Sequence, residues 1–328
     1  MTRLRTALVA CLAALACADA PPPSMPDGVA FHVTPLAIGE ADLDRLGPLR
    51  LRGAVAMQSR DESFGSYSGL HVSDDGTRLI AIGWGSWLVG HVGHGPAGDL
   101  TGFELDGVFP LRDAGGRPIA DDADKDAEGL VEHEGSYYVG FETNSRVARH
   151  RGIDAAAEPV DLPPGDLAAI PACCGFSSVA FTARHELLAL TEGAQDSAGN
   201  VKGWLWRNGR AEALWLREEP RWLPVDVALL PGGDLLLVEV REDPWSERWH
   251  SRFSRIADAD VRPGGRMPAH PLGELYSADH PDRIEGIHAR KGSKGETLIY
   301  AISDSRRGWP TNLLMFELEH RWDPGDRS

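Results

Sequence analysis

Carboxylates gather in the segment Asp122–Glu128, which places four acidic side chains within seven residues. Its three aspartates alternate along the chain, as the first ligands of an EF-hand calcium loop do. However, Ala127 stands where that loop needs a glycine, and His133 stands where it needs a bidentate glutamate. We therefore reject an EF-hand. Two interpretations remain, a looser calcium loop that leads to Glu128 or a solvated acidic loop.

Other residues that could do chemistry form weaker patterns. The stretch "GSYSG" has Tyr67 at its centre, where a nucleophile elbow needs serine, so it does not indicate a serine hydrolase. His91 and His94 are three residues apart, and in a strand-rich chain we expect them to be surface histidines. No P-loop or dinucleotide fingerprint is present in the sequence.

A repeat organises the acidic residues along the chain. Five short motifs ("YSGLHV", "AEGLVE", "FSSVAF", "PVDVAL" and "IEGIHA") have opening polar residues that lie 49 to 60 residues apart, and each motif leads through a turn into an apolar run such as "DLLLVEV". The polar residues that open these motifs are Ser68, Glu128, Ser177, Asp226 and Glu285. A second set follows the next apolar run: Trp84, Glu142, Glu192, Glu239 and Asp304.

This spacing predicts an all-β fold, a single β-propeller of five or six four-stranded blades. Two packed β-sandwiches would not require a repeat. The leading segment "LRLRGAVAM" is free to supply the missing outer strand of the last blade. We expect this N-terminal strand to close the ring, which removes the exposed edges of an open sheet.

In such a propeller, the first strands of the blades face a central channel, so the two sets converge there. Oxygen-rich sites of this kind suit Ca²⁺, which accepts six to eight hard ligands. Repeat proteins also use acids to bind the backbone of a neighbouring blade, so an architectural role stays open. Arg146, Arg255 and Arg306 follow the second strands and could either offset the negative charge or hold an anionic substrate.

The N-terminus has the features of an export signal, with a basic "MTRLR" followed by a short apolar run. Cleavage before Cys17 would make a lipoprotein, and cleavage after "ADA" would place Pro21 next to the cut. We favour the lipoprotein and expect an exported protein that is periplasmic or membrane-anchored through Cys17. The predicted boundaries are a signal at 1–17, a Pro-rich linker at 18–28, the propeller at 29–322 and a tail at 323–328.

Charge and cysteine content limit the partners further. A net charge of −16 repels phosphate backbones, so we expect no nucleic-acid partner, and we expect a monomer. In the exported domain only Cys173 and Cys174 remain, either as a strained vicinal disulfide or as two free thiols.

The segments "DAEGLV", "YYVGFETNSRVARH", "LPGGDLLLVEV" and "LIYAISDS" resemble a bacterial family described as phytase-like, or esterase-like activity of phytase. The resemblance covers about residues 47–318. It implies a secreted or lipid-anchored propeller with phosphoesterase activity. Three positions depart from the family pattern: Trp84 and Ser177 replace acids, and Ser305 replaces an asparagine.

The residue pattern alone does not separate a hydrolase from a binding propeller, but the resemblance implies a metal-assisted phosphoric-ester hydrolase that acts on a small anionic or phosphorylated substrate, and we predict this function. Its predicted catalytic residues are Glu128, Glu285, Arg146 and Arg255. Its predicted ligands for Ca²⁺ are Asp126, Glu128, Glu142, Glu192, Asp226, Glu239, Glu285 and Asp304. The alternative is a non-catalytic propeller that binds a ligand or protein at the cell envelope.

Overall fold

The computed structural model describes residues 30–162, 170–172, 174–217, 221–244, 248–276, 283–305 and 309–319. The predicted signal, linker and C-terminal tail lie outside these residues, as do Cys17, Cys173, Trp245 and Arg306. None of the helices in the described ranges is long and apolar enough to cross a membrane.

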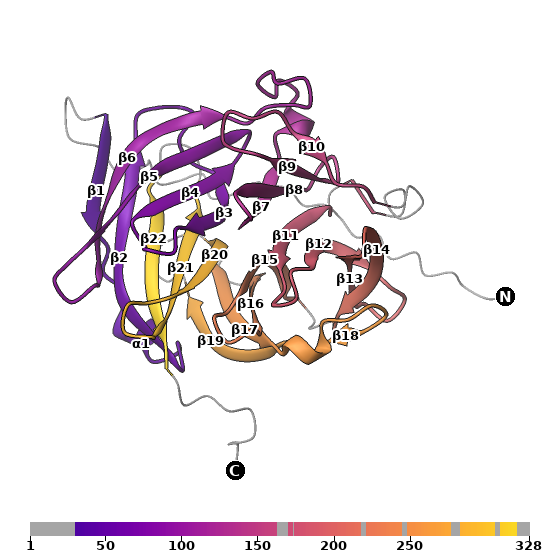
Figure 1. Cartoon of the computed structure of the whole chain (residues 1–328). Helices are drawn as coiled ribbons and strands as arrows, with labels where there is room; N and C mark the ends of the chain where they lie inside the picture. Colours follow the sequence, from indigo (N-terminus) through magenta and orange to yellow (C-terminus); the bar gives the residue numbers. More distant parts are fainter. Residues whose placement is uncertain are drawn as a thin grey trace, which may run out of the picture.

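Five antiparallel blades form the fold, as the repeat predicts (Figure 1). The first contains β3 (Tyr67–Val72), β4 (Arg78–Gly83), β5 (Ser86–His94) and β6 (Leu100–Pro110). The second contains β7 (Ala127–His133), β8 (Ser136–Phe141), β9 (Arg146–His150) and β10 (Glu158–Pro159). The fourth contains β15 (Leu223–Leu229), β16 (Leu235–Glu242), β17 (Trp249–Ile256) and β19 (His270–Tyr276).

The other two blades have a fifth strand, which the sequence did not predict. The third contains β11 (Phe176–Phe181), β12 (Leu187–Gln195), β13 (Val201–Arg207), β14 (Arg210–Leu216) and the parallel β18 (Arg266–Met267). The fifth contains β20 (Arg283–Lys291), β21 (Thr297–Asp304), β22 (Thr311–Leu318), β2 (Leu49–Ser59) and β1 (Phe31–Pro35). Short helical turns lie at Glu40–Leu43 (α1), Asp122–Asp124 and Asp258–Asp260.

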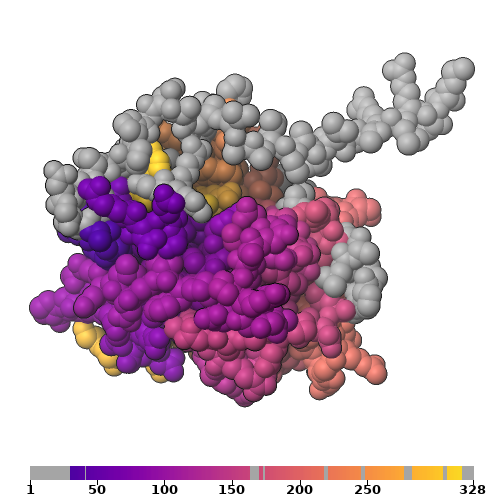
Figure 2. Space-filling model, turned by 90° about the horizontal axis from the view of Figure 1, so that it is seen from above, coloured from indigo at the N-terminus to yellow at the C-terminus, as the bar shows by residue number. Residues whose placement is uncertain are grey.

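The N-terminal strand closes the ring, as predicted. In the fifth blade, β2 pairs antiparallel with β22, so the two ends of the described chain meet in one sheet. The inner strands β3, β7, β11, β15 and β20 contact one another in sequence, and β20 contacts β3. Figure 2 shows the first, second and third blades side by side along one flank of this ring.

The core lies between the blades. Five buried clusters form, one at each of the five blade interfaces. Because both faces of a blade are covered, its middle strands contain continuous apolar runs, as in β16 ("LLLV", residues 235–238), instead of alternating with polar residues. Tight turns join them, such as Asn208–Gly209, where both residues have positive φ (50° and 72°) as a two-residue hairpin requires.

Each inner strand carries a β-bulge near its start. In β3, β7, β11 and β20 the residue that the bulge leaves out of the ladder is Ser68, Glu128, Ser177 or Glu285. A bulge leaves its extra residue unpaired and re-aims its side chain. The bulges therefore determine which of the polar residues that open the five motifs point in the same direction.

Candidate functional site

The starts of the inner strands and the ends of the second strands meet at one end of the propeller axis. In the fifth blade, for example, Arg283 pairs with Asp304 across β20 and β21. In the second, Ala127 pairs with Phe141, so the residues next to them, Asp126 and Glu142, also come together. We call this end the acidic end, and define it by Asp126, Glu128, Glu142, Glu192, Arg283, Glu285 and Asp304.

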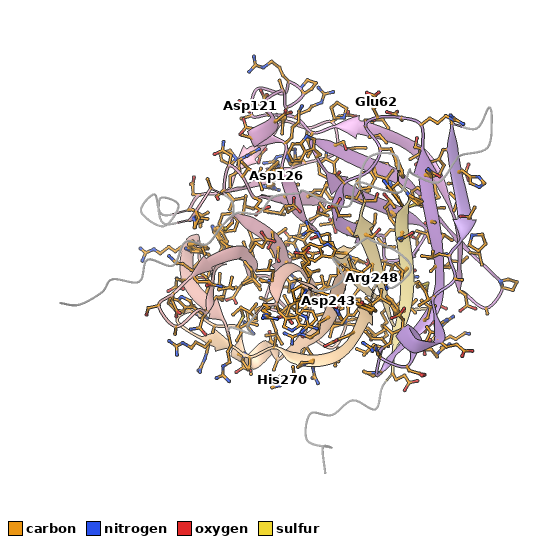
Figure 3. The ribbon with its side chains drawn as sticks, turned by 180° about the vertical axis from the view of Figure 1, so that it is seen from behind. Glu62, Asp121, Asp126, Asp243, Arg248 and His270 are labelled. Carbon is orange, nitrogen blue, oxygen red and sulfur yellow. The ribbon has the colours of Figure 1, made fainter. Side chains whose placement is uncertain are left out.

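Three carboxylates of the second blade are close enough to share one metal ion. Asp126, Glu128 and Glu142 each offer an oxygen, and these atoms all lie within 4.8 Å of one another. Asp126, which can be located in Figure 3, is held in place because one of its oxygens accepts hydrogen bonds from the backbone N–H (3.1 Å) and the hydroxyl of Thr143. Glu142 is fixed next to it by its own N–H, which donates to the Asp126 carbonyl at 2.9 Å.

Glu128 is surrounded by other acids. Burial raises the pKa of its carboxyl well above the usual value, and the neighbouring carboxylates of Glu285 and Asp126 raise it further. The Ser68 side chain opposes this rise through a hydrogen bond to Glu128. Such a carboxyl stays protonated unless a cation stabilises its charged form.

Glu142 forms a carboxyl pair with Glu192 of the third blade. Burial raises the pKa of Glu142 to about 11, and the charge and hydrogen bond of Glu192 add to this effect. Two carboxyls in contact cannot both ionise readily, so without a metal ion the pair holds a proton. The pair thus extends the acidic end from the second blade to the third.

Arg283 belongs to the acidic end, and the sequence analysis did not predict it. Its guanidinium forms an ion pair with Glu285 and lies 3.9 Å from an oxygen of Asp304. It also lies over the ring of Trp249, 4.8 Å from the centroid. Burial raises the pKa of Glu285 to about 8 although Arg283 opposes the rise. Arg283 precedes its bulge by two residues, as Asp126 does in the second blade, and comparing these two positions would have found it.

The acidic run itself divides between two roles. Asp126 belongs to the three-carboxylate group, whereas Asp122 pairs with Lys125 at 2.9 Å. Asp124 accepts from the Asn144 amide at 2.6 Å and lies 3.4 Å from the Arg146 guanidinium. Arg146 also donates to the Asp124 carbonyl (2.6 Å). The predicted catalytic residue Arg146 therefore fastens this loop to the β8–β9 hairpin at the edge of the acidic end.

The sequence analysis treated Asp226 as the equivalent of Glu128, and this equivalence is wrong by one residue. In β15 the ladder passes from Pro224 to Asp226, so the bulged residue equivalent to Glu128 is Val225. Asp226 is wholly buried, and its oxygens accept from the backbone N–H groups of Val227 (2.8 Å) and Ile287 (2.7 Å). It joins the fourth blade to the fifth, which is the architectural role that the sequence left open.

Glu239 and Arg255 also have partners away from the acidic group. Glu239 is buried and receives two hydrogen bonds from Arg252 (2.9 and 3.0 Å) and one from Ser254 (2.8 Å), so its charge is already compensated. Arg255 forms an ion pair with Asp234, in the turn that precedes β16. That turn lies at the opposite end of the strand from Glu239, so the structure does not bring Arg255 to the acidic end.

The remaining predicted positions have simpler surroundings. Ser177 donates to the Pro224 carbonyl at 3.1 Å. His91 is exposed and lies 3.3 Å from Asp106, whereas His94 is partly buried against the hydroxyl of Tyr300 (3.2 Å). Trp84 is exposed where four other blades have acids.

Six carboxylates and one guanidinium thus make up the acidic end within the described residues. The donors are all oxygen atoms, and they lie in or next to strands β7, β8, β12, β20 and β21 of the second, third and fifth blades. Hard oxygen donors suit Ca²⁺ or Mg²⁺ better than softer metals. The arrangement can hold a divalent cation and, next to it at Arg283, an anionic group.

Comparison with known proteins gives a family match and several similar solved structures. The family model described as phytase-like, esterase-like activity of phytase, matches residues 62–305. No curated protein matches the chain. Similar solved structures include an endo-arabinase from Bacteroides thetaiotaomicron VPI-5482, with 12% identity, 79% of this chain and 95% of that chain covered, and a TM-score of 0.47.

Two further solved structures are similar at the same level. A putative gluconolactonase has 13% identity, covers 88% of this chain and 100% of its own, and has a TM-score of 0.41. An aldose sugar dehydrogenase from Streptomyces coelicolor has 13% identity, coverages of 90% and 99%, and a TM-score of 0.38. At such identities and scores, these similarities do not inform the chemistry of the site.

Proposed function

Because the chain belongs to the phytase-like family, we propose that it is a metal-assisted phosphoric-ester hydrolase with its active site at the acidic end. One observation carries this proposal: oxygens of Asp126, Glu128 and Glu142 lie within 4.8 Å of one another. Three carboxylates at this separation repel one another, and a cation shared between them would offset this repulsion.

The residues fit Ca²⁺. Asp126, Glu128 and Glu142 would hold the ion, since they offer only oxygen ligands. Glu192, Glu285 and Asp304 add negative charge around them. When bound, the ion would polarise a phosphoryl oxygen and lower the pKa of a coordinated water.

Side chains of the protein would bind the phosphoryl group and accept the proton of the attacking water. Arg283 lies beside the carboxylates and is suited to bind the phosphoryl oxygens, the role that the sequence analysis gave to Arg146 and Arg255. Glu285, with a pKa of about 8, is suited to accept the proton of the attacking water. The water oxygen bonds to phosphorus, the ester P–O bond breaks, and the departing alkoxide takes up a proton from solvent.

A second candidate, a non-catalytic binding propeller, is favoured by the incomplete ring of acids. The first, third and fourth blades have Ser68, Ser177 and Val225 at the bulge, and Trp84 replaces an acid. Turnover separates the two candidates, because binding without hydrolysis leaves the ester intact.

We further propose that the protein works outside the cytoplasm as a lipoprotein attached through Cys17. The basic residues and short apolar run before Cys17 support this proposal. Metabolic labelling with a fatty acid should mark the wild-type chain and not Cys17→Ser. Labelling of both chains would contradict the anchor.

The decisive experiment is hydrolysis of chromogenic phosphomonoesters, phosphodiesters and carboxyl esters by metal-stripped protein, with and without Ca²⁺. We expect calcium-dependent hydrolysis of a phosphoric ester. Glu128→Gln should lower kcat/KM by at least about 100-fold, since loss of even an outer-shell partner costs 10–100-fold.

Asp122→Asn is the matched control, because Asp122 is in the same loop but pairs with Lys125. It should leave kcat/KM within about twofold of the wild-type value. Full activity in a chelator would contradict metal assistance. No turnover of any ester would favour the binding propeller.

A further inference from the structure

Trp84 is one of two large apolar side chains that are exposed in the described part of the chain. Its relative exposure is 44%, and the other, Leu43, lies on α1. Trp87, three residues later, is fully buried in the core between the first and second blades. The first blade therefore fills its core with Trp87 and leaves Trp84 available for another role.

In the first blade, Trp84 has the position that acids of the acidic end have in other blades. It directly follows β4, which is the place that Glu142 has after β8 and Glu192 has within β12. An indole thus stands where neighbouring blades have carboxylates.

Backbone hydrogen bonds hold the segment of Trp84 next to the loop that carries Asp126. The N–H of Trp84 donates to the Ser66 carbonyl at 3.3 Å, and the N–H of Gly85 donates to the Lys125 carbonyl at 2.7 Å. Lys125 immediately precedes Asp126, one of the three clustered acids. A Cβ on Gly85 would come within 2.8 Å of the Lys125 side chain, so the two segments are in close contact.

We propose that Trp84 is a stacking platform for the alcohol part of the substrate, and that the site selects phosphoric esters of alcohols with a flat aromatic ring. This inference rests on the proposed function. In a phosphoric ester, the bridging oxygen joins the phosphoryl group directly to a carbon of the alcohol, so the alcohol part lies beside a phosphoryl group bound at the three carboxylates and Arg283. The segment of Trp84 contacts the loop that carries Asp126, and on this basis we place the indole beside the alcohol part. An indole face can stack on an aromatic ring there and adds affinity beyond buried area.

Binding of uncleavable analogues tests this inference without turnover. Phenylphosphonate and methylphosphonate share the phosphonate group and differ in the ring, and their C–P bond is not an ester. Isothermal titration calorimetry of the calcium-loaded chain should show tighter binding of phenylphosphonate. Trp84→Ala should reduce this preference by about 3- to 10-fold, the equivalent of a typical aromatic pair.

Two further variants complete the test. Trp84→Phe keeps an aromatic face and should retain most of the preference. Leu43→Ala removes the other exposed apolar side chain and should change neither affinity. Equal weakening of both phosphonates by Trp84→Ala would overturn the inference, as would an unchanged preference.

The outcomes separate this inference from the proposed function. A ring preference that depends on Trp84, in a protein that hydrolyses no ester, would support the platform and contradict the hydrolase. Calcium-dependent hydrolysis without any ring preference would support the hydrolase and overturn the platform.

Discussion

At the scale of single residues, three acids that the sequence repeat groups together have three different environments because their neighbours differ. Glu239 is matched by the guanidinium of Arg252, and Asp226 accepts from two backbone N–H groups. Glu128 instead faces Glu285 and Asp126, which raise its pKa together with burial. Only the last environment leaves negative charge for a cation to compensate.

The role of Glu239 can be tested directly. Glu239→Ala should lower the free energy of unfolding by about 3–5 kcal/mol, because it leaves the buried Arg252 charge unpaired. Chemical denaturation measures this change. Calcium affinity, measured by calorimetry under conditions where the variant is folded, should stay the same.

Replacing both partners, as in Glu239→Leu with Arg252→Met, is the control, and it should recover much of the lost stability. A variant that keeps its stability and loses calcium binding would make Glu239 a metal ligand after all.

At the scale of elements, the bulge and the glycine after it set how closely the inner strands approach. A Cβ on Gly129 would lie 2.8 Å from the backbone N of Val179 in the third blade, and one on Gly286 would lie 2.5 Å from the Ser68 carbonyl. In β15 the equivalent residue is Asp226, whose side chain bridges to Ile287 instead. The fourth and fifth blades are thus joined by a carboxylate, where the fifth and first, first and second, and second and third blades meet closely through a glycine.

Asp226→Ala should therefore destabilise the interface between the fourth and fifth blades. It leaves the buried N–H groups of Val227 and Ile287 without their acceptor, and each such loss costs about 1–3 kcal/mol. We expect a total loss of about 2–5 kcal/mol by urea unfolding. Asp154→Ala, at an exposed position, is the control and should change stability by less than about 0.5 kcal/mol. A loss at Asp226 no larger than that of the control would contradict the bridging role.

At the scale of the whole molecule, the net charge of −16 is concentrated in part at the acidic end. Closure of the ring by β2 forces acids from several blades towards one axis, and their repulsion opposes closure. A bound cation, or protons on these acids, would relieve it.

Burial and mutual repulsion of these acids predict how the stability of the protein depends on pH. Glu285 and Glu142 have folded-state pKa values of about 8 and about 11, raised chiefly by burial. An acid with a raised pKa binds more protons when folded, so in a chelator stability should fall as pH rises from about 7 to about 9. Histidines with lowered pKa values, such as His71, do not titrate in this range.

Thermal melts at these two pH values, with chelator and with Ca²⁺, measure the effect. The rise in Tm on adding Ca²⁺ should be larger near pH 9 than near pH 7, because the cation then replaces protons that the folded chain has lost. An equal rise at both values, or none, would argue against a metal at the acidic end.

The sequence by itself determined the propeller, the five repeats and the closing N-terminal strand. It could do so because apolar runs, turn residues and repeat spacing are local properties. It also identified Glu128, Glu142 and Glu285, since residues that recur at one place in a repeat occupy equivalent positions in the blades, and it identified Asp126 from the acidic run that leads to Glu128.

Only the tertiary structure decided which acids act together. In "PVDV" the bulge falls on Val225, and one residue of register reverses the direction of a side chain, so Asp226 points into an interface. Arg283 and Arg252 acquire their partners across strands, and sequence spacing does not reveal such pairs. The chemistry of each acid depends on charges brought near it by the closed ring, and that proximity exists only once the blades have packed.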